Sequence, residues 1–346
     1  MNSIAIIGTG SSGLAAAHTL QDAGRHVTLF EQSQEVGGRA ATRNRNGFIY
    51  DHGAQYIKGE GSADATAFIT ERFRAPDLLN IAKPVWIFDR TGYIQEGDPQ
   101  QNATPRWNYR SGLTALAKQM AQGLTIHFNT HITHLEQIAD GWRLIDNNNR
   151  HVGDYKKLLM TMPAPQVVEI LQASQLIPFL QQSIINALKS VDYNPLISVM
   201  LGYRPAPRSR PYYALVNTDK AHAISWLAWE HEKDAARVPT GCGLLIAQMA
   251  PHYSREHWEQ ADEQSLLNDV ARLIAALIDE TLPSPIFTDI QYWRYALPIT
   301  RADADALNRQ TIPHGLAFCG DAFVGGRVHL ALEHGVKVAQ NLLYGV

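Results

Sequence analysis

The sequence predicts an α/β protein with a parallel sheet, and segments near its two ends carry this prediction. Residues 4–7 are apolar and mostly β-branched, and they lead through Gly8-Thr9-Gly10-Ser11-Ser12-Gly13 into a helix-like stretch at residues 14–20. A second strand at residues 27–31 ends in an acid. Near the other end, a strand at residues 316–319 is again followed by glycines and a helix-like stretch. Strands that alternate with helices in this order indicate helices packed on a parallel sheet.

Each glycine of the first segment has its own physical role. Gly8 permits a tight turn out of the strand, Gly10 lets the backbone approach a pyrophosphate, and Gly13 lets the helix pack close to the sheet. The helix start at Ser11 and Ser12 offers free N–H groups and the positive end of its dipole to phosphates. Because a strand precedes the motif and a helix follows it, the segment favours a dinucleotide site over an ordinary turn.

The residues after the second strand narrow this prediction to FAD. Glu31, followed by Gln32, stands where an acid accepts hydrogen bonds from a ribose 2′-OH. Gly37-Gly38 permits a second close approach of the backbone, and Arg39 can pair with phosphate oxygens through its guanidinium group. Alone, such a Gly-Gly-Arg would be an ordinary solvated turn, but its distance from Glu31 favours FAD.

The C-terminal segment predicts a second part of the same site. The strand at residues 316–319 ends in Gly320-Asp321, a glycine loop runs to Arg327, and a helix is expected at residues 328–343. Asp321 can accept a hydrogen bond from a ribityl hydroxyl, and the helix start at Val328 can point N–H groups at the N1/C2=O edge of a flavin.

Composition excludes several other classes of function. The 346 residues carry a formal net charge of −3 and are 45% hydrophobic, so charge favours neither nucleic acid nor an anionic membrane as a partner. No apolar run reaches transmembrane length. The cofactor motif occupies the N-terminus, so we expect a cytoplasmic location. Cys242 and Cys319 form no disulfide framework, and the histidines show no metal-type spacing, so no metal is expected.

Patterning along the chain predicts the remaining elements. A hairpin with its turn at Gly92 is expected at residues 85–95, and amphipathic helices at residues 111–120 and 263–279. The expected strands lie at residues 124–128, 132–138, 142–144, 157–162, 197–201, 223–229 and 243–250.

These elements predict two interleaved domains. The first is a Rossmann-like FAD-binding domain, with a parallel sheet, helices and a small antiparallel layer. It comprises residues 1–80, 110–165 and 288–346. The second is an α+β substrate domain with an antiparallel sheet, comprising residues 81–109 and 166–287.

The chain resembles a known family at several points. The N-terminal set of glycines, Glu31 and Arg39 is similar to the glutathione-reductase-type FAD fold of flavin amine oxidases. Within that group, residues 50–57, 292–298 and 319–323 resemble renalase and its bacterial relatives. The resemblance implies noncovalent FAD and oxidation of misreduced dihydro isomers of NAD(P)H, with electrons passed to O2 to give H2O2.

Three positions depart from the pattern of those relatives. His329 stands where an acid is usual, His334 where a serine is usual, and Gln291 where a histidine is usual. Two imidazoles near the flavin can change the protonation of a bound substrate. Because they are five positions apart on a helix, we expect at most one of them to point at the ring.

The residues and the resemblance together predict two sets of site residues. The expected cofactor-binding residues are Gly8, Gly10, Ser11, Ser12, Gly13, Glu31, Gln32, Gly38, Arg39, Gly53, Ala54, Gln55, Tyr56, Ile132, Met162, Gly320, Asp321, Arg327 and Val328. The expected catalytic residues, which include an aromatic wall facing the flavin, are Tyr56, Trp226, Trp293, Arg294, Tyr295 and His329. The alternative for the aromatic residues is packing within a sheet.

Three functional hypotheses remain open at this point. The leading one is a renalase-like FAD oxidase that acts on dihydronicotinamide dinucleotides and O2. The second is an amine oxidase acting on a small primary or secondary amine. The third is a flavin-binding, desaturase-like or regulatory protein without fast oxidase activity. Oligomeric state does not follow from the sequence.

Overall fold

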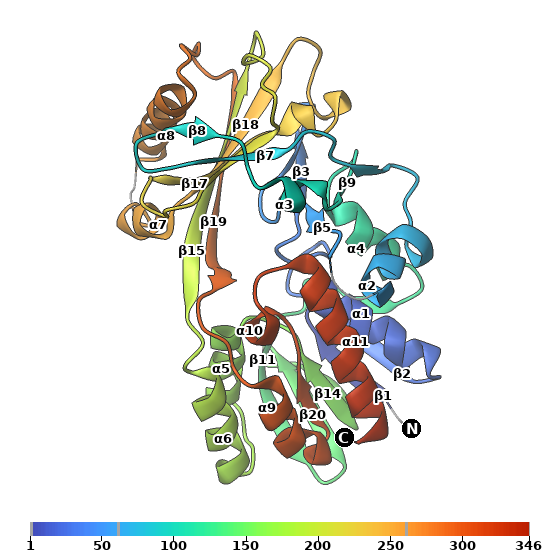
Figure 1. The fold of residues 1–346 in the computed structure, drawn as a ribbon. Coiled ribbons are helices and arrows are strands. Elements are labelled where there is room, and N and C mark those ends of the chain that lie inside the picture. The colour runs from blue at the N-terminus through green and yellow to red at the C-terminus, as the bar shows by residue number, and fades with distance from the viewer. Residues whose placement is uncertain (1–2, 61–62, 260–261, 346) are drawn as a thin grey trace.

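A five-stranded parallel sheet forms one half of the molecule in the computed structural model, which describes residues 3–60, 63–259 and 262–345 (Figure 1). In spatial order, its strands are β10 (Thr125–His127), β2 (His26–Phe30), β1 (Ser3–Ile7), β14 (Lys157–Met160) and β20 (Leu316–Phe318). Every neighbouring pair is parallel. The carboxyl ends of β1, β2 and β20 therefore bring the N- and C-terminal glycine segments to one edge.

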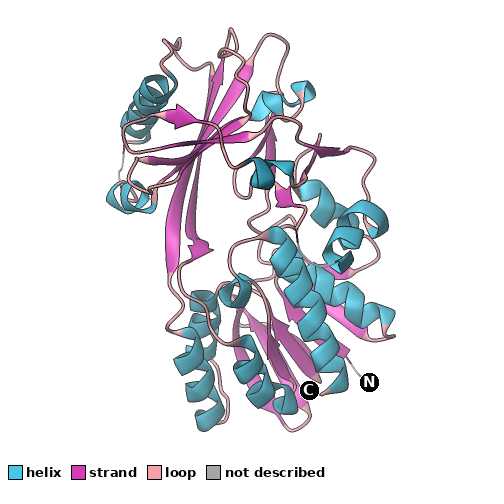
Figure 2. Cartoon of the chain, viewed as in Figure 1, coloured by secondary structure: helices cyan, strands magenta, loops and turns pink. Residues whose placement is uncertain are grey.

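Helices cover one face of this sheet, and a layer of strands and helices covers the other (Figure 2). On the first face, α1 (Ser11–Asp22) packs against α11 (Val328–Tyr344) and α4 (Thr114–Ala121). The second face buries the antiparallel sheet and helices that connect the strands. These are β11 (Ile132–Ile138), β12 (Gly141–Asp146), β13 (His151–Tyr155), α5 (Ala164–Gln172), α6 (Pro178–Leu188) and α9 (Ala304–Thr311).

A seven-stranded sheet forms the other half of the molecule. Its order is β19 (Phe287–Pro298), β15 (Tyr193–Tyr203), β18 (Gly243–Met249), β17 (Ile224–Trp229), β16 (Ala214–Asn217), β7 (Val85–Phe88) and β8 (Ile94–Gln95). Its pairs are antiparallel except for β16 with β7. The helices α7 (Pro251–Glu256) and α8 (Glu263–Ile278) lie on one face, where Val270 and Ile274 join the core. On the other face, Met200, Leu244 and Ile246 pack against Phe48 and Tyr50 of the hairpin at residues 42–51.

Short elements connect the two halves. They are the hairpin β3 (Thr42–Arg45) and β4 (Phe48–Asp51), the sheet of β5 (Ile57–Lys58), β9 (Arg106–Tyr109) and β6 (Leu78–Asn80), and the helices α2 (Ala63–Ala67), α3 (Pro99–Ala103) and α10 (Asp321–Val324). Single turns lie at Phe68–Arg72, Glu230–Glu232, Ala235–Arg237 and Ile312–His314. The long strands β15 and β19 also run from the large sheet toward the parallel-sheet half (Figure 1).

The predicted α/β class is confirmed, and most predicted elements lie where expected. The hairpin β7–β8 turns at Gly92, whose φ is 81°. The helix expected at residues 111–120 begins later, at Thr114, because Gly112 has a φ of 95°. β14 ends at Met160 rather than at residue 162, and α5 and α6 were not predicted.

One strand belongs to a different sheet from the one that the predicted domain boundaries imply. β19 falls in a segment that the sequence assigned to the FAD-binding domain, yet its hydrogen bonds join it to β15 in the large sheet. The division into domains stays a prediction. Among the described helices, none is long and apolar enough to span a bilayer.

Candidate functional site

The turn after β1 has the geometry that its glycines require. Gly8 has a φ of 104°, in the region where side chains are strained. A Cβ added to Gly13 would lie 2.2 Å from the carbonyl oxygen of Gly8, so α1 packs closer to the turn than any side chain allows. At Gly10, by contrast, no described atom lies within 4 Å of an added Cβ.

The start of α1 is open beside this space. Gly10 is the N-cap residue, and no side chain caps the helix, so the first N–H groups remain free for a ligand. Ser11 and Ser12 form the first turn. Free N–H groups and the positive end of the helix dipole suit a phosphate at this position.

Glu31 lies at the carboxyl end of β2, where the sequence predicted it. The carboxylate of Glu31 accepts hydrogen bonds from Thr9 N at 3.0 Å and from Ser33 N at 2.9 Å. The side-chain hydroxyl groups of Thr9 and Ser33 also donate to it. These bonds fix the acid beside the glycine turn. Gln32, which follows it, is exposed.

Arg39 and Asp321 join the two ends of the chain. Arg39 Nη1 and Nη2 donate to Asp321 Oδ2 at 2.6 Å and Oδ1 at 2.8 Å, and Nη1 also donates to the carbonyl oxygen of Tyr295 at 2.7 Å. Tyr193 Oη donates to Asp321 Oδ1 at 3.2 Å. The sequence placed Arg39 and Asp321 in the cofactor site separately, and the structure brings them together.

Gly38 and the backbone segment 52–56 extend the site from this pair toward the large sheet. A Cβ on Gly38 would lie 3.5 Å from Gly10 Cα. The amide of Ala54 donates to the carbonyl oxygen of Arg39 at 2.9 Å, and a Cβ on Gly53 would lie 2.1 Å from that same oxygen. On the other side, Gln248 Nε2 of β18 donates to the carbonyl oxygen of Gly53 at 2.6 Å.

Two of the predicted aromatic residues lie on the face of the large sheet that is turned toward this segment. Trp226 is paired with Gln248 in register, so both side chains point to the same face, and its ring lies 6.0 Å from that of Tyr56. Trp293 Nε1 donates to the carbonyl oxygen of His52 at 2.8 Å, and the two rings stack 5.3 Å apart.

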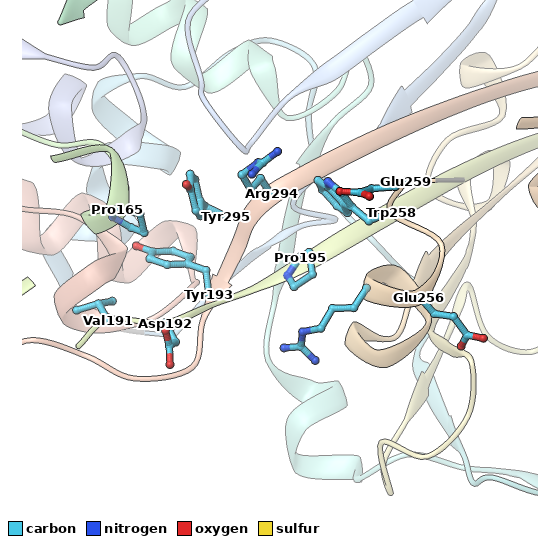
Figure 3. Close-up of a pocket in the computed structure, with 11 residues that line it drawn as sticks. Pro165, Val191, Asp192, Tyr193, Pro195, Glu256, Trp258, Glu259, Arg294 and Tyr295 are labelled. Carbon is cyan, nitrogen blue, oxygen red and sulfur yellow. The ribbon is translucent and has the colours of Figure 1, made fainter. Parts of the chain in front are cut away.

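Arg294 does not join this surface. Alternate residues of a strand point to opposite faces, so Arg294 lies on the face away from Trp293. Arg294 and Tyr295 line a pocket of about 560 Å³ together with Tyr193 and Trp258 (Figure 3). The structure thus separates Arg294 from Trp293, whereas Tyr295 stays next to the Arg39–Asp321 pair, because its carbonyl oxygen accepts from Arg39 and its ring lies 5.8 Å from that of Tyr193.

The two histidines of α11 have different surroundings. His334 Nδ1 lies 3.2 Å from the amide nitrogen of Gly320, and burial lowers the pKa of His334 to about 4. It therefore supports the Gly320 turn from inside the protein. His329 is also buried, which lowers its pKa, and its Nδ1 has no hydrogen-bond partner among the described residues.

The remaining predicted cofactor residues lie around the same edge. Met162 follows β14, and its amide nitrogen is 3.9 Å from a Cβ added at Gly8. Ile132 is buried in β11, just after Thr130, whose amide donates to the carbonyl oxygen of Glu31. At the start of α11, Val328 is partly buried, while exposed Arg327 donates to the carbonyl oxygen of Gly326.

Sequence reasoning missed several residues at this junction. His52 is 5% exposed, and burial lowers its pKa to about 4. A fully buried group of four charged side chains lies beneath the same segment: Asp51, Glu230, Lys233 and Arg237. A signal for Asp51 and His52 existed, because they directly precede the predicted Gly53. The other three follow β17 and belong to no motif.

Comparison with known proteins agrees with this geometry. The family model described as flavin containing amine oxidoreductase matches residues 85–343, and one described as an NAD(P)-binding Rossmann-like domain matches residues 6–71. Reduced UDP-galactopyranose mutase has a similar fold, with a TM-score of 0.78 and 13% identity over 100% of this chain and 96% of the other.

Curated relatives are similar over parts of their length. All-trans-retinol 13,14-reductase of Macaca fascicularis is 25% identical over 253 residues, which are 70% of this chain and 38% of the relative. A 4,4'-diapophytoene desaturase of Staphylococcus haemolyticus is 46% identical over 136 residues, which are 39% of this chain and 26% of the relative. The chain thus spans well under half the length of these relatives.

The described residues fit FAD at the edge of the parallel sheet. The space above Gly10 and the uncapped start of α1 suit a pyrophosphate, and Glu31 suits a ribose. Arg39, Asp321 and the segment 52–56 then lead from the phosphate position to the aromatic surface of the large sheet. The chain belongs to the flavin containing amine oxidoreductase family.

Proposed function

We propose that the protein oxidises dihydronicotinamide dinucleotides whose extra hydride lies at C2 or C6, and that O2 accepts the electrons. The products are NAD(P)+ and H2O2. The observation that carries this proposal is the aromatic surface formed by Tyr56, Trp226 and Trp293 next to the Gly53 segment. Such a surface suits a flat ring better than a flexible chain, because aromatic rings stack on one another.

Bound FAD supplies the hydride acceptor. Trp226 and Tyr56 hold the substrate ring in the space between themselves and the cofactor site. The reacting carbon of the ring then lies close to the hydride acceptor. The substrate ring becomes positively charged as the hydride leaves. The electron-rich faces of the two aromatic residues favour that charge, and so they bind the product-like state more strongly than the neutral substrate.

The charges at this junction favour a substrate whose reacting ring is uncharged over one whose reacting group is an ammonium ion. Asp51 and Glu230 are paired with Lys233 and Arg237, while Asp289 is paired with Arg43 and Arg45. None of these three carboxylates is therefore free to hold the ammonium group of a small amine. This distribution supports a dihydronicotinamide over an amine substrate.

A second candidate is a flavin oxidoreductase that uses a protein or quinone acceptor instead of O2. The similarity to a desaturase and to a retinol reductase favours it. Under this alternative the site passes hydride to or from an apolar chain, and reoxidation by air is slow.

The test is anaerobic mixing of the FAD-loaded protein with an equilibrated mixture of NAD(P)H isomers, followed by the flavin absorbance. We expect bleaching to be at least about tenfold faster than with fresh NADH, which corresponds to roughly 1.4 kcal/mol in the barrier. In air, the same mixture should produce peroxide. Equal bleaching rates with both reagents would reject the proposal.

Two further arms of that experiment separate the alternatives. Bleaching by a panel of primary and secondary amines, including diamines, would identify an amine oxidase. Fast bleaching by the isomers, followed by slow reoxidation in air, would keep the substrate and reject O2 as the acceptor.

A further inference from the structure

Four charged side chains meet in the interior between the β3–β4 hairpin and the large sheet. We call Asp51, Glu230, Lys233 and Arg237 the buried quartet; all four side chains are 0% exposed. Lys233 Nζ lies 3.2 Å from Asp51 Oδ2 and 2.8 Å from Glu230 Oε2. Arg237 pairs with the same two carboxylates. Two basic and two acidic side chains thus face one another in the protein interior.

Stability alone does not account for this arrangement. Ion pairs removed from water lose hydration, and apolar side chains of similar size often stabilise a protein equally well. The positions of the quartet indicate another role. Asp51 ends β4 and directly precedes His52 and Gly53, whereas the other three residues follow β17 of the large sheet.

The quartet is bonded to the segment that faces the cofactor site. Lys233 Nζ donates to Gln55 Oε1 at 3.3 Å, and Gln55 Nε2 donates to the carbonyl oxygen of Gly53 at 3.2 Å. Gln248 Nε2 reaches that same oxygen from the large sheet at 2.6 Å. Asp51 is also fixed from behind, because Asn108 Nδ2 donates to its carboxylate at 3.0 Å.

We propose that the buried quartet positions the Gly53–Gln55 segment beside the flavin ring and sets the reduction potential of the flavin through the balance of its four charges. Lys233 is the central positioning residue, since it contacts both carboxylates and Gln55. This inference depends on FAD being bound along the path from Gly10 to Gly53. It does not depend on which hydride donor is the substrate.

The direction of the effect follows from electrostatics. Reduction adds negative charge to the flavin. An unbalanced positive charge nearby therefore favours reduction and raises the potential, whereas an unbalanced negative charge lowers it. In the interior such a charge is poorly screened by solvent and salt, so its influence reaches beyond its direct neighbours.

The test measures the reduction potential of the FAD-loaded protein by stepwise reduction against a reference dye. Burial raises the pKa of Glu230, so the measurement is made at about pH 8.5 to favour its ionised form. Lys233→Met leaves one net negative charge, and we expect a lower potential. Glu230→Gln leaves one net positive charge, and we expect a higher potential. The double variant Glu230→Gln/Lys233→Met is balanced again and should return close to the wild-type value.

A matched control changes an ion pair on the far side of the large sheet. Arg210 pairs with Glu280 at 2.9 Å, so Arg210→Met also leaves an unpaired acid, and the potential should not change. Shifts of the same sign in both single variants, or no shift in either, would overturn the proposal. If Lys233→Met does not fold, Glu230→Gln decides: a higher potential supports the proposal, and an unchanged or lower potential overturns it.

Because no substrate is used, this result is independent of the proposed reaction. Opposite shifts together with no oxidation of NAD(P)H isomers would keep the role of the quartet and reject the proposed function. Unchanged potentials together with fast oxidation of the isomers would keep the proposed function and reject the role of the quartet.

Discussion

A methyl group added at Gly10 and one added at Gly13 would meet different surroundings. At Gly13 it would lie 2.2 Å from a backbone oxygen of the protein itself. At Gly10 it would enter space that no described atom occupies within 4 Å. One position is therefore restricted by the fold and the other by the cofactor, although both belong to the same motif.

Gly10→Ala and Gly13→Ala should separate these two requirements. For Gly13→Ala we expect the apoprotein to lose about 1–3 kcal/mol of unfolding free energy, because the helix must move away from the turn. Gly10→Ala should cost about 1 kcal/mol or less, yet reduce FAD affinity at least about tenfold. Urea unfolding and FAD titration measure the two effects. Wild-type FAD affinity in Gly10→Ala would contradict the position given to the pyrophosphate.

His52 and His334 connect stability to pH. Burial lowers the pKa of each to about 4, while a histidine in the unfolded chain titrates near 6.5. Between these values the unfolded chain binds more protons than the folded one. Their contribution to stability is therefore complete above about pH 6.5 and declines as the pH falls toward 4, by about 1.4 kcal/mol per pH unit for each group.

His334→Asn should remove one of these two contributions, since the amide oxygen can still accept from the Gly320 N–H. We expect the slope of unfolding free energy against pH to decrease by about 1.4 kcal/mol per unit between about pH 4.5 and 6. Urea unfolding at several pH values gives the slope. The exposed His131→Asn serves as the control and should leave it unchanged. An unaltered slope in His334→Asn would contradict a buried neutral imidazole.

At the scale of elements, the two faces of β19 carry residues that are neighbours in sequence but lie in different surroundings. Trp293 faces the Gly53 segment and donates a hydrogen bond to the carbonyl oxygen of His52. Arg294 lines the pocket that it shares with Tyr193 and Trp258. Side chains alternate regularly up to Trp293, but Asn194 of β15 pairs with Leu297 while Leu196 pairs with Trp293, so β19 has an irregularity between these two positions. Which side chains of β19 face the proposed cofactor site therefore depends on how β19 pairs with β15.

Variants on the two faces should differ in activity. Trp226→Leu is expected to lower kcat/KM for NAD(P)H isomers at least about tenfold, because the stacking surface for the substrate ring is lost. Arg294→Gln should stay within about twofold of the wild type. Steady-state kinetics and the flavin spectrum check both variants. A comparable loss in Arg294→Gln would restore the role that the sequence predicted for it.

The elements that could be predicted from sequence are those whose signals are local. β11 has the predicted bounds, and α8 follows the predicted apolar periodicity. Helix α5 has no clear local signal, because Pro163 and Pro165 suit the end of a strand as well as the first turn of a helix.

The cofactor site could be predicted further than the substrate site for the same reason. Glycines, Glu31 and Asp321 follow strands directly, so their positions are determined by nearby sequence. Lys233 and Arg237 reach Asp51 only through the packing of the large sheet against the β3–β4 hairpin. No spacing in the sequence relates these residues, and their role depends on the tertiary fold.

At the scale of the whole molecule, FAD should stabilise the fold by mass action. The proposed FAD site is formed by segments from both ends of the chain, so FAD is expected to bind only the folded state. Free FAD at about a thousand times its Kd should then add roughly 4 kcal/mol to the unfolding free energy. Thermal unfolding with and without FAD measures this, with Gly10→Ala as the control that should gain little. An equal gain in that variant would indicate binding elsewhere.

The packing of α11 against α1 has a consequence for how the protein is made. A Cβ on Gly335 would lie 2.2 Å from the carbonyl oxygen of Ser12, so the two helices touch at their backbones. A ribosome synthesises α1 among the first residues described here and α11 among the last. Until α11 has been synthesised, the apolar face of α1 lacks this partner helix and the C-terminal part of the proposed flavin site is missing. The proposed FAD site is therefore complete only after α11 has been synthesised.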